Sequence, residues 1–403
     1  MTQELKRWAF LALIGSFVAA SFSNSFFEIF TGAFLCLSLL ALVLEKRFDV
    51  FKSLFGLVVC IYFLVAVLSL TQSSYWATSL KGVFRVLRCA LMSFFVIYLV
   101  EDERRFKKIF YVFAVSAFLI GLDALLQGVS GIEFLRGRPM TPFSAEVGRV
   151  TGPFQHANDF SAYLSLVIFI FLGMIYFLKK NGLWKGLFFD AFGGFTLVIC
   201  LLWTYSRGAW LAVLLGCIVM AFLKRSRMTV ISLIVFCLLI YFLSPVLLKS
   251  RMASLWNPKD GTMTERRLLW NEAIQMNSER PWLGYGINTY AKIEPQFKSK
   301  QIHTDNQYAH NGYLQIAAET GWVGLGSFLA VIIFFFARAF KKESTPQNEF
   351  LSAAAFSLTL GILSFLIHSA TDTDLQSLRL VSLLWLSMGL VLAAKKISGN
   401  VAG

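Results

Sequence analysis

Twelve apolar runs, separated by polar segments, divide the chain. They lie near residues 8–22, 26–45, 53–71, 84–100, 109–127, 160–178, 187–204, 209–223, 229–247, 311–337, 350–367 and 377–394. A helix needs about 20 apolar residues to cross a bilayer, so each run is a candidate span. Of the 403 residues, 57% are hydrophobic and 15% charged, against about 25% charged in soluble domains. The sequence therefore predicts an all-α polytopic membrane protein with about twelve transmembrane helices, forming a single integral membrane domain over residues 1–403.

The basic residues indicate how the chain is threaded through the membrane. If the N-terminus is cytoplasmic, the inside segments contain Lys6 and Arg7; Lys46, Arg47 and Lys52; Arg104, Arg105, Lys107 and Lys108; Lys179, Lys180 and Lys185; Lys224, Arg225 and Arg227; Arg338, Lys341 and Lys342; Lys395 and Lys396. The short outside loops contain only Arg207. Because this is the positive-inside pattern, both termini are expected in the cytoplasm. Two longer segments, 128–158 and 248–309, are then expected to form periplasmic loops.

The net charge of +14 favours an anionic partner. Much of the excess lies in or beside the outward segments, where long loops translocate regardless of charge. Nucleic acid is not the expected partner, because these loops contain no known binding module and face away from the cytoplasm. An anionic group on the outer side of the membrane, such as a lipid phosphate, would explain the excess.

The larger outward loop is expected to be partly helical. Its segment 263–276, MTERRLLWNEAIQM, places Leu268, Leu269, Ala273 and Ile274 on one helical face. Thr264 is a plausible N-cap, and Pro281 would end the helix. The pattern favours an amphipathic helix lying at the membrane surface.

Two motifs on the outward side contain arginine. Ser206-Arg207-Gly208 lies in a tight turn between two spans. Arg207 either extends to the membrane interface beside aromatic residues or holds a phosphate with its planar fork. In the segment RRLLW at 266–270, helical spacing puts Arg266 on the face of Trp270 and turns Arg267 roughly 100° away. One of these two arginines can then face the bundle while the other faces water.

Two further motifs follow in the same loop. The segment PWLGYG at 281–286 has glycines that allow positive φ, and structural support is its expected role. Where the chain re-enters the membrane it contains HNGYL at 310–314 and ETG at 319–321. His310 is suited to act as a base near neutral pH, and packing or capping is the alternative.

Metal binding is not expected. The four histidines, His156, His303, His310 and His368, are all predicted on the outer side, without a His-x3-His spacing or a cysteine in an outer loop. Asp372-Thr373-Asp374 imitates the Asp-x-Asp that holds a metal and a nucleotide diphosphate in soluble glycosyltransferases. The predicted topology places it where nucleotide sugars are absent.

In this order, the motifs resemble the O-antigen ligase family of lipopolysaccharide assembly, whose conserved region also includes O-antigen polymerases and protein O-oligosaccharyltransferases. The resemblance rests on Ser-Arg-Gly at 206–208, Arg266 with Trp270, Pro-x-x-Gly-x-Gly at 281–286, and His-Asn-x-x-Leu with Glu-x-Gly at 310–321. That family requires an Arg in the tight turn, an Arg in the large loop and a His near the loop's end.

The resemblance implies catalytic roles for Arg207, Arg266 and His310. It makes Arg267 the register alternative to Arg266 and implies that Asn311 contributes to substrate binding. Arg149 is assigned to substrate binding as well, because it precedes a Gly-x-Phe-x-x-x-Asn segment at 152–158 that is similar to the family's entrance to the next span.

The implied reaction moves a glycan from undecaprenyl diphosphate to a hydroxyl of the lipid A core oligosaccharide, at the periplasmic face of the bacterial inner membrane. Fixed guanidiniums would neutralise the leaving diphosphate, so no metal or other cofactor is expected. His310 would take the acceptor's proton, and direct attack would invert the anomeric centre.

Three basic residues outside the motifs, Lys81, Arg85 and Arg88, share a helical face at the outer end of the fourth span. We expect them either to hold an anionic lipid group of the donor or acceptor, or only to set the depth of the span.

Two alternatives remain. A polymerase would use the same donor and a second lipid-linked glycan as acceptor. A transporter of the same lipid belongs to a different class and would place polar groups near the membrane midplane. Glu28, Arg85, Arg88 and Asp123 lie toward span ends instead, which disfavours the transporter; the sequence separates the polymerase from the ligase poorly.

Overall fold

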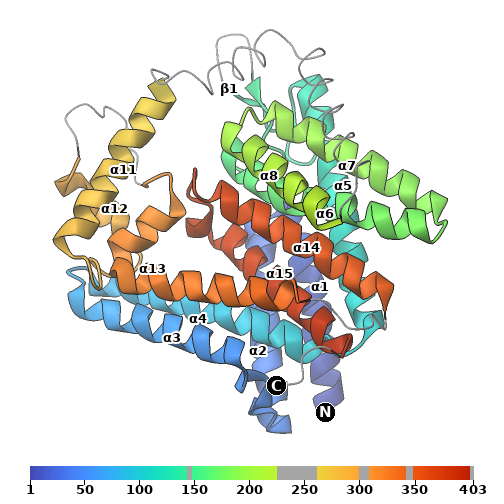
Figure 1. Cartoon of the computed structure of the whole chain (residues 1–403), viewed down its shortest axis with the longest axis horizontal. Helices are drawn as coiled ribbons and strands as arrows, with labels where there is room; N and C mark the ends of the chain where they lie inside the picture. Colours follow the sequence, from blue (N-terminus) through green and yellow to red (C-terminus); the bar gives the residue numbers. More distant parts are fainter. Residues whose placement is uncertain (143–147, 225–260, 299–307, 342–347, 400–403) are drawn as a thin grey trace. The chain divides into compact units, whose positions relative to one another are not determined.

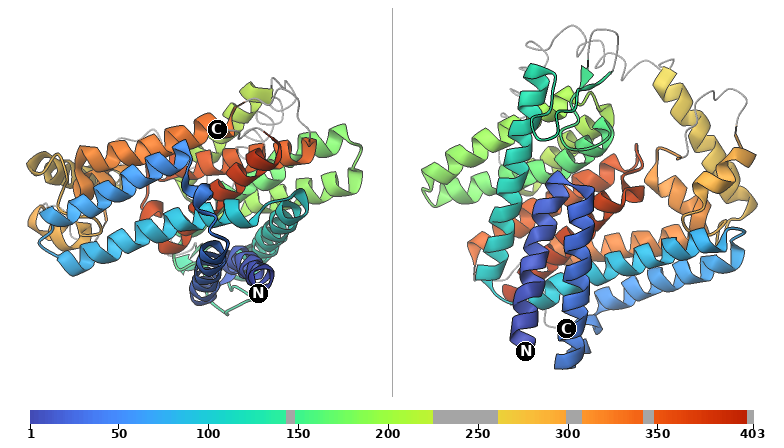
Figure 2. Two further views of the ribbon diagram at one scale, coloured as in Figure 1. Left: turned by 90° about the horizontal axis from the view of Figure 1, so that it is seen from below. Right: turned by 180° about the vertical axis from the view of Figure 1, so that it is seen from behind.

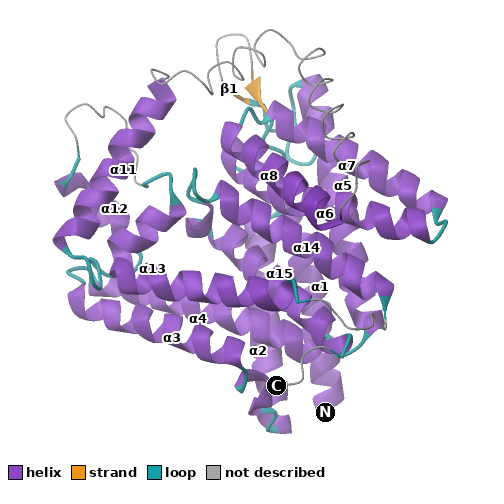
Figure 3. Ribbon diagram, in the orientation of Figure 1, coloured by secondary structure: helices purple, strands orange, loops and turns teal. Residues whose placement is uncertain are grey.

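The computed structural model describes residues 1–142, 148–224, 261–298, 308–341 and 348–399. These residues are mostly helical (Figure 3). Among them are 11 helices long and apolar enough to cross a membrane. These helices match the predicted apolar runs except 229–247, which lies outside the described residues. The prediction of an all-helical polytopic membrane protein is confirmed.

The chain forms two compact units, which are described separately. The first comprises Met1–Val112, Glu265–Ala355 and Ser369–Gly403, and the second comprises Phe113–Thr264 and Phe356–His368. Helices α5 (Glu103–Ser130), α11 (Gly261–Glu279) and α14 (Glu349–His368) contribute residues to both units.

The first unit is built on six long helices. They are α1 (Thr2–Phe22), α2 (Asn24–Glu45), α3 (Leu54–Leu68), α4 (Trp76–Leu99), α13 (Gly312–Ala339) and α15 (Leu378–Ile397). Helices α3, α4 and α13 run side by side, and α15 packs on α4 (Figures 1 and 2). Short 3₁₀ helices flank them at Phe48–Phe51 (η1), Ser69–Gln72 (η2), Glu294–Gln296 (η4) and Asp374–Gln376 (η5).

A buried arginine fixes the start of α15. The Arg379 side chain donates to the carbonyls of Ala20 (2.6 Å) and Ser21 (2.8 Å) and to the side chain of Asn24 (3.2 Å). These carbonyls end α1, where the last turn of a helix lacks intrahelical donors and attracts positive charge. Arg379 therefore joins the α1–α2 turn to α15.

Helix α13 is kinked at Gly321, and the kink is filled by another segment. Gly321 has φ 68° and ψ −174°, a combination essentially restricted to glycine. The Pro281–Gly286 segment pairs with the interrupted helix through its backbone: Trp322 N–H donates to the Pro281 carbonyl (2.7 Å), and Gly286 N–H donates to the Glu319 carbonyl (2.8 Å). The helical groups freed by the kink are thus satisfied.

The Glu319 side chain extends the same connection. Its carboxylate accepts from the backbone N–H of Asn288 (2.7 Å) and of Tyr290 (3.3 Å), and from the Gln315 amide (3.2 Å). Because Glu319 is only 3% exposed, these three donors replace the water that a carboxylate requires.

Helices α11 (Gly261–Glu279) and α12 (Tyr290–Ile293) belong to the loop predicted to be partly helical. They lie at the end of the α3–α4–α13 layer where α13 begins (Figure 1). A small hydrophobic core joins them to α13; its buried residues are Ala273, Met276, Tyr285, Tyr290, Ile293, Ala309 and Ala318.

The predicted apolar face of α11 is only partly correct. Leu269 and Ala273 are buried, whereas Ile274 is 47% exposed, and Met276 occupies the core instead. The helix already runs from Gly261, so Thr264 lies within it and is not its N-cap.

The second unit contains α6 (Ala157–Lys180), α7 (Trp184–Trp203), α8 (Arg207–Lys224) and a two-stranded hairpin. Strands β1 (Thr141–Pro142) and β2 (Gly148–Arg149) pair antiparallel. Helix α6 packs on α7 and α8. Only residues 204–206 separate α7 from α8, in agreement with the predicted tight turn.

The kink generates a stability prediction with an internal control. A Cβ at Gly321 would lie 2.2 Å from the Trp282 backbone and would need a positive φ, whereas a Cβ at Gly326 of the same helix meets no atom within 4 Å. We expect Gly321→Ala to lower the free energy of unfolding by about 2 kcal/mol or more, and Gly326→Ala to leave it unchanged or slightly higher. Thermal unfolding of both variants in detergent measures this. Equal melting temperatures would contradict the account of the kink.

Candidate active site

His310 stands immediately before α13 in a constrained backbone conformation. Its φ is 46°, and the next residue, Asn311, caps α13 by accepting from the backbone N–H groups of Tyr313 and Leu314 (both 3.1 Å). Gly312 N–H donates to the carbonyls of Ser369 (2.8 Å) and Asp372 (3.1 Å). The start of α13 is therefore held against the segment between α14 and α15.

Asp372 connects His310 and Arg266, the two candidate catalytic residues of the first unit. Its Oδ1 lies 3.1 Å from His310 Nδ1, and its Oδ2 lies 3.3 Å from Arg266 Nη2. Asp372 is 4% exposed, so its charge is compensated by protein groups more than by water. The contacts join the start of α11, the start of α13 and the 369–376 segment.

The two neighbouring arginines of α11 differ in environment. Arg266 is partly buried and contacts Asp372, whereas Arg267 is exposed. Trp270, one turn after Arg266, donates from its indole N–H to the His310 carbonyl (3.4 Å). The Arg266–Trp270 face thus points toward His310 and Asp372.

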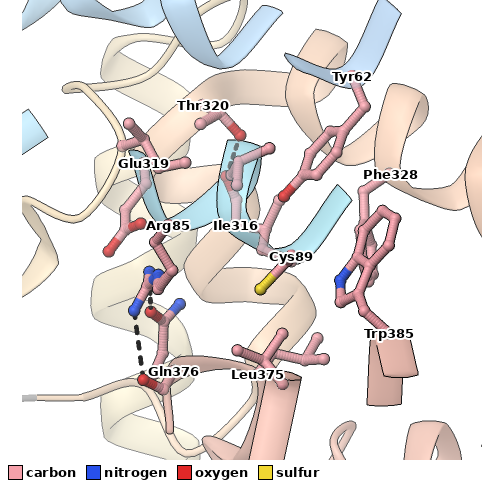
Figure 4. A pocket seen from close by; sticks show the side chains of 13 residues that line it. Tyr62, Arg85, Cys89, Ile316, Glu319, Thr320, Phe328, Leu375, Gln376 and Trp385 are labelled. Carbon is pink, nitrogen blue, oxygen red and sulfur yellow. Dashed lines mark hydrogen bonds between the residues drawn. The ribbon is translucent and has the colours of Figure 1, made fainter. Parts of the chain in front are cut away.

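The segment that carries Asp372 is fixed on both sides. Thr373 N–H donates to Asp372 Oδ1 (2.9 Å), and the Ser369 hydroxyl donates to Asp374 Oδ2 (3.1 Å). Arg85 of α4 donates to the backbone carbonyl (3.2 Å) and the side-chain oxygen (2.8 Å) of Gln376 (Figure 4). Arg85, which was expected either to hold an anionic lipid group or to set the depth of the span, thus binds Gln376 of η5 in this structure.

A small cavity of about 40 Å³, lined mostly by apolar side chains, lies next to this contact. Arg85, Glu319, Gln376, Tyr62 and Trp385 are among its lining residues (Figure 4). A cavity of this size has room for a few water molecules and is too small for a sugar or a diphosphate. We interpret it as part of the support beneath the Asp372 segment.

The other basic residues of α4 have different surroundings. Lys81 is exposed. Arg88 forms an ion pair with Glu28 (2.5 Å) and donates to the Thr31 hydroxyl (2.7 Å). Of the three basic residues predicted to share a face of α4, Lys81 is therefore exposed, whereas Arg85 and Arg88 bind protein groups.

The Asp-x-Asp pattern does not present a carboxylate pair to one ligand. Asp372 contacts His310 and Arg266, whereas Asp374 accepts from Ser369, and both residues are at most 4% exposed. Within the described ranges, no group of three or more His, Cys, Asp or Glu side chains could hold a metal ion. His303 lies outside those ranges.

The tight turn of the second unit carries Arg207. This residue begins α8 and is partly buried. The preceding Tyr205 has φ 54°, and the Ser206 hydroxyl lies 3.3 Å from Nε2 of the buried His368. The positive φ of Tyr205 and the contact between Ser206 and His368 constrain the turn that precedes Arg207.

Arg149 supports this turn from the hairpin. Its Nε donates to the Thr204 carbonyl (2.6 Å), and its Nη2 donates to the Asn158 side chain (2.5 Å). Val150 N–H also donates to the Trp203 carbonyl (3.1 Å). Arg149 thus connects Asn158, in the first turn of α6, to Thr204 of the tight turn. Asn158 ends the 152–158 segment that resembles the family's entrance to the next span.

Asp372 is the site residue whose role the sequence did not predict. The Asp-x-Asp pattern drew attention to it only as a metal ligand. The available indication was that a carboxylate lies in a loop predicted on the same side of the membrane as the candidate base and the two candidate anion anchors. Asp372 lies 62 residues after His310 and 106 residues after Arg266 in the sequence, so spacing along the chain does not reveal these contacts.

The arrangement can perform acid–base chemistry on an anionic substrate. With Nδ1 directed to Asp372, the neutral imidazole that donates from Nδ1 has its lone pair at Nε2, where it can accept a proton. Asp372 would then stabilise the imidazolium. Arg266 donates to the other oxygen of the Asp372 carboxylate. Its guanidinium is therefore close to the His310 ring.

Comparison with known families identifies a similarity over the part of the chain that carries the motifs. The sequence model of the O-antigen ligase family matches residues 192–329, a range that includes all four motifs. A search of curated proteins found no match. Over residues 192–329 the chain is similar to the O-antigen ligase family, as the order of its motifs predicted.

Proposed function

We propose that this protein is a glycosyltransferase that moves a glycan from undecaprenyl diphosphate to the lipid A core oligosaccharide. The family match supports an enzyme acting on lipid-linked glycans, either a ligase or a polymerase. The observation that carries the proposal is the Arg266–Asp372–His310 cluster at the end of the large loop. It combines a candidate base with a cation suited to a diphosphate.

The leaving group sets the first requirement. As the bond between the anomeric carbon and the diphosphate oxygen breaks, negative charge develops on the diphosphate. In our proposal the forks of Arg207 and Arg266 neutralise this charge, which is the role that metals have in many nucleotide-sugar enzymes. Arg266 contacts Asp372 through Nη2, and the remaining N–H groups of its guanidinium are suited to a phosphate.

The acceptor sets the second requirement. A sugar hydroxyl becomes a good nucleophile only as its proton is removed, and His310 Nε2 is the proposed proton acceptor. The acceptor oxygen forms the new bond to the anomeric carbon, the diphosphate leaves, and the proton passes to His310. One direct displacement inverts the anomeric centre.

Location follows from the same proposal. The positive-inside pattern places the 248–309 loop, and with it Arg266, on the periplasmic side of a bacterial inner membrane. Both proposed substrates are anchored in lipid, so a site at the start of α13 would meet them at the membrane surface.

Identification of the product tests the proposal. Purified protein is incubated with undecaprenyl-diphosphate-linked glycan and a lipid A core acceptor. We expect glycan on the lipid A core. A longer lipid-linked glycan would show a polymerase instead, and movement of intact donor across vesicles without transfer would show a transporter.

The two neighbouring arginines provide a matched comparison. We expect Arg266→Ala to reduce transfer about 10²- to 10³-fold, because a group that stabilises transition-state charge is lost. Arg267→Ala should change it less than about threefold, because Arg267 is exposed. Initial rates at equal membrane abundance measure both. The reverse order would assign the anchor to Arg267.

His310 should affect turnover more than binding. We expect His310→Ala to lower single-turnover transfer about 10²- to 10⁴-fold and to change donor affinity little, because a base acts mainly in the transition state. Donor binding and single-turnover rates are measured separately, with and without EDTA. Lost donor binding, or EDTA-sensitive transfer restored by a divalent ion, would contradict the mechanism.

A further inference from the structure

A second cleft opens within the first unit, at the turn between α3 and α4. Its volume is about 700 Å³, and it is lined by residues 71–74 of that turn and by 279–284 at the end of α11. Pockets that bind small organic ligands usually have about 300–1,000 Å³. The cleft is therefore large enough for several sugar rings, unlike the cavity beside Arg85.

The charges of the cleft do not suit a diphosphate. Its lining contains one acidic residue, Glu279, and one basic residue, Arg280. Arg280 donates to the Gln72 carbonyl (2.7 Å) and stacks over the Tyr285 ring (4.3 Å to the centroid), and Glu279 accepts from the Tyr285 hydroxyl (2.7 Å). Burial and this hydrogen bond raise the pKa of Tyr285 to about 12, so the hydroxyl remains a donor. The opposite charges are thus engaged within the protein.

The remaining lining offers hydroxyl and amide groups with one exposed aromatic ring. Thr71, Gln72 and Ser74 are exposed in the turn. Trp282 on the opposite wall is 71% exposed. Hydroxyl and amide groups bind sugar hydroxyls, and the face of an indole attracts the polarised C–H groups of a sugar ring.

The position of Trp282 is fixed by its backbone. The flanking Pro281 accepts from Trp322 N–H (2.7 Å), and a Cβ on Gly321 would lie 2.2 Å from the Trp282 carbonyl oxygen. The indole is therefore presented from a braced segment, so little backbone freedom is lost when a ligand binds. Substitution of the side chain leaves these backbone contacts unchanged.

We propose that this cleft is a carbohydrate subsite that holds uncharged sugar residues of the glycan chain, with Trp282 as its stacking platform. The inference rests on the proposed function for the source of the glycan. In this proposal the glycan chain binds in the cleft through hydroxyl, amide and aromatic groups, whereas the diphosphate binds to the proposed anchors Arg207 and Arg266. The subsite favours donors whose glycan is long enough to reach it.

Oligosaccharide binding tests the subsite without any transfer reaction. The full-length protein in detergent is titrated calorimetrically with the oligosaccharide released from the donor, which has neither lipid nor diphosphate. We expect Trp282→Ala to weaken binding about three- to tenfold and Trp282→Phe to restore most of the loss. Trp76→Ala is the control, because Trp76 is 59% exposed and does not line the cleft.

Transfer kinetics supply the second measurement. For a long-chain donor, Trp282→Ala should raise KM by the same factor with little change in kcat, and a donor with a single sugar should be unaffected. Unchanged oligosaccharide binding in Trp282→Ala, or an equal loss in Trp76→Ala, would overturn the subsite. If Trp282→Ala reduced transfer only in lipid bilayers and not in detergent, the subsite would be overturned too, because Trp282 would then act as a membrane anchor. If the wild type binds the oligosaccharide but never transfers glycan from the undecaprenyl-diphosphate-linked donor, the proposed function fails and the subsite stands.

Discussion

The Asp372 carboxylate is the interaction on which the candidate site depends. A carboxylate that is 4% exposed must be compensated, and Arg266 and His310 compensate it from two separate parts of the chain. Removing one partner of such a buried group leaves a charge without sufficient solvation, at a cost of about 3–5 kcal/mol. The same contacts therefore bring the candidate residues together and orient the proposed base, His310. Arg85 and Thr373 fix the carboxylate's own segment through protein contacts.

The backbone connection at the α13 kink has a complementary role. Gly284 and Gly321 let the 281–286 segment approach α13 more closely than any side chain would permit. This connection ties the end of α11 to α13, while Asp372 ties the start of α11 to the start of α13. Two motifs that are separate in the sequence, Pro-x-x-Gly-x-Gly and Glu-x-Gly, are therefore one structural feature. The two motifs pack against each other through their backbones, and the same contacts hold the Trp282 backbone at the second cleft.

The sequence predicts some of this organisation well because the information is local. Length and hydropathy identify the membrane helices, and helical spacing separates Arg266 from Arg267. Contacts between distant segments are not encoded in such patterns. Neither the Asp372 cluster nor the pairing of Arg88 with Glu28 follows from spacing, because each needs the packing of helices far apart in the chain. Arg149 was similarly expected to bind substrate, and the structure directs it to Thr204 and Asn158. The exposed Ile274 shows that an apolar residue on a short loop helix need not face the core.

The central claim is that Asp372 and His310 act as one unit in glycan transfer, and a double-mutant cycle tests it most directly. Single-turnover transfer is measured for the wild type, Asp372→Asn, His310→Gln and the double variant at saturating donor. If Asp372 acts by orienting the base, the double variant is about as slow as His310→Gln alone, because the carboxylate has no further role once the base is gone. If the two losses multiply, the residues act independently, and the proposed Asp372–His310 unit is wrong.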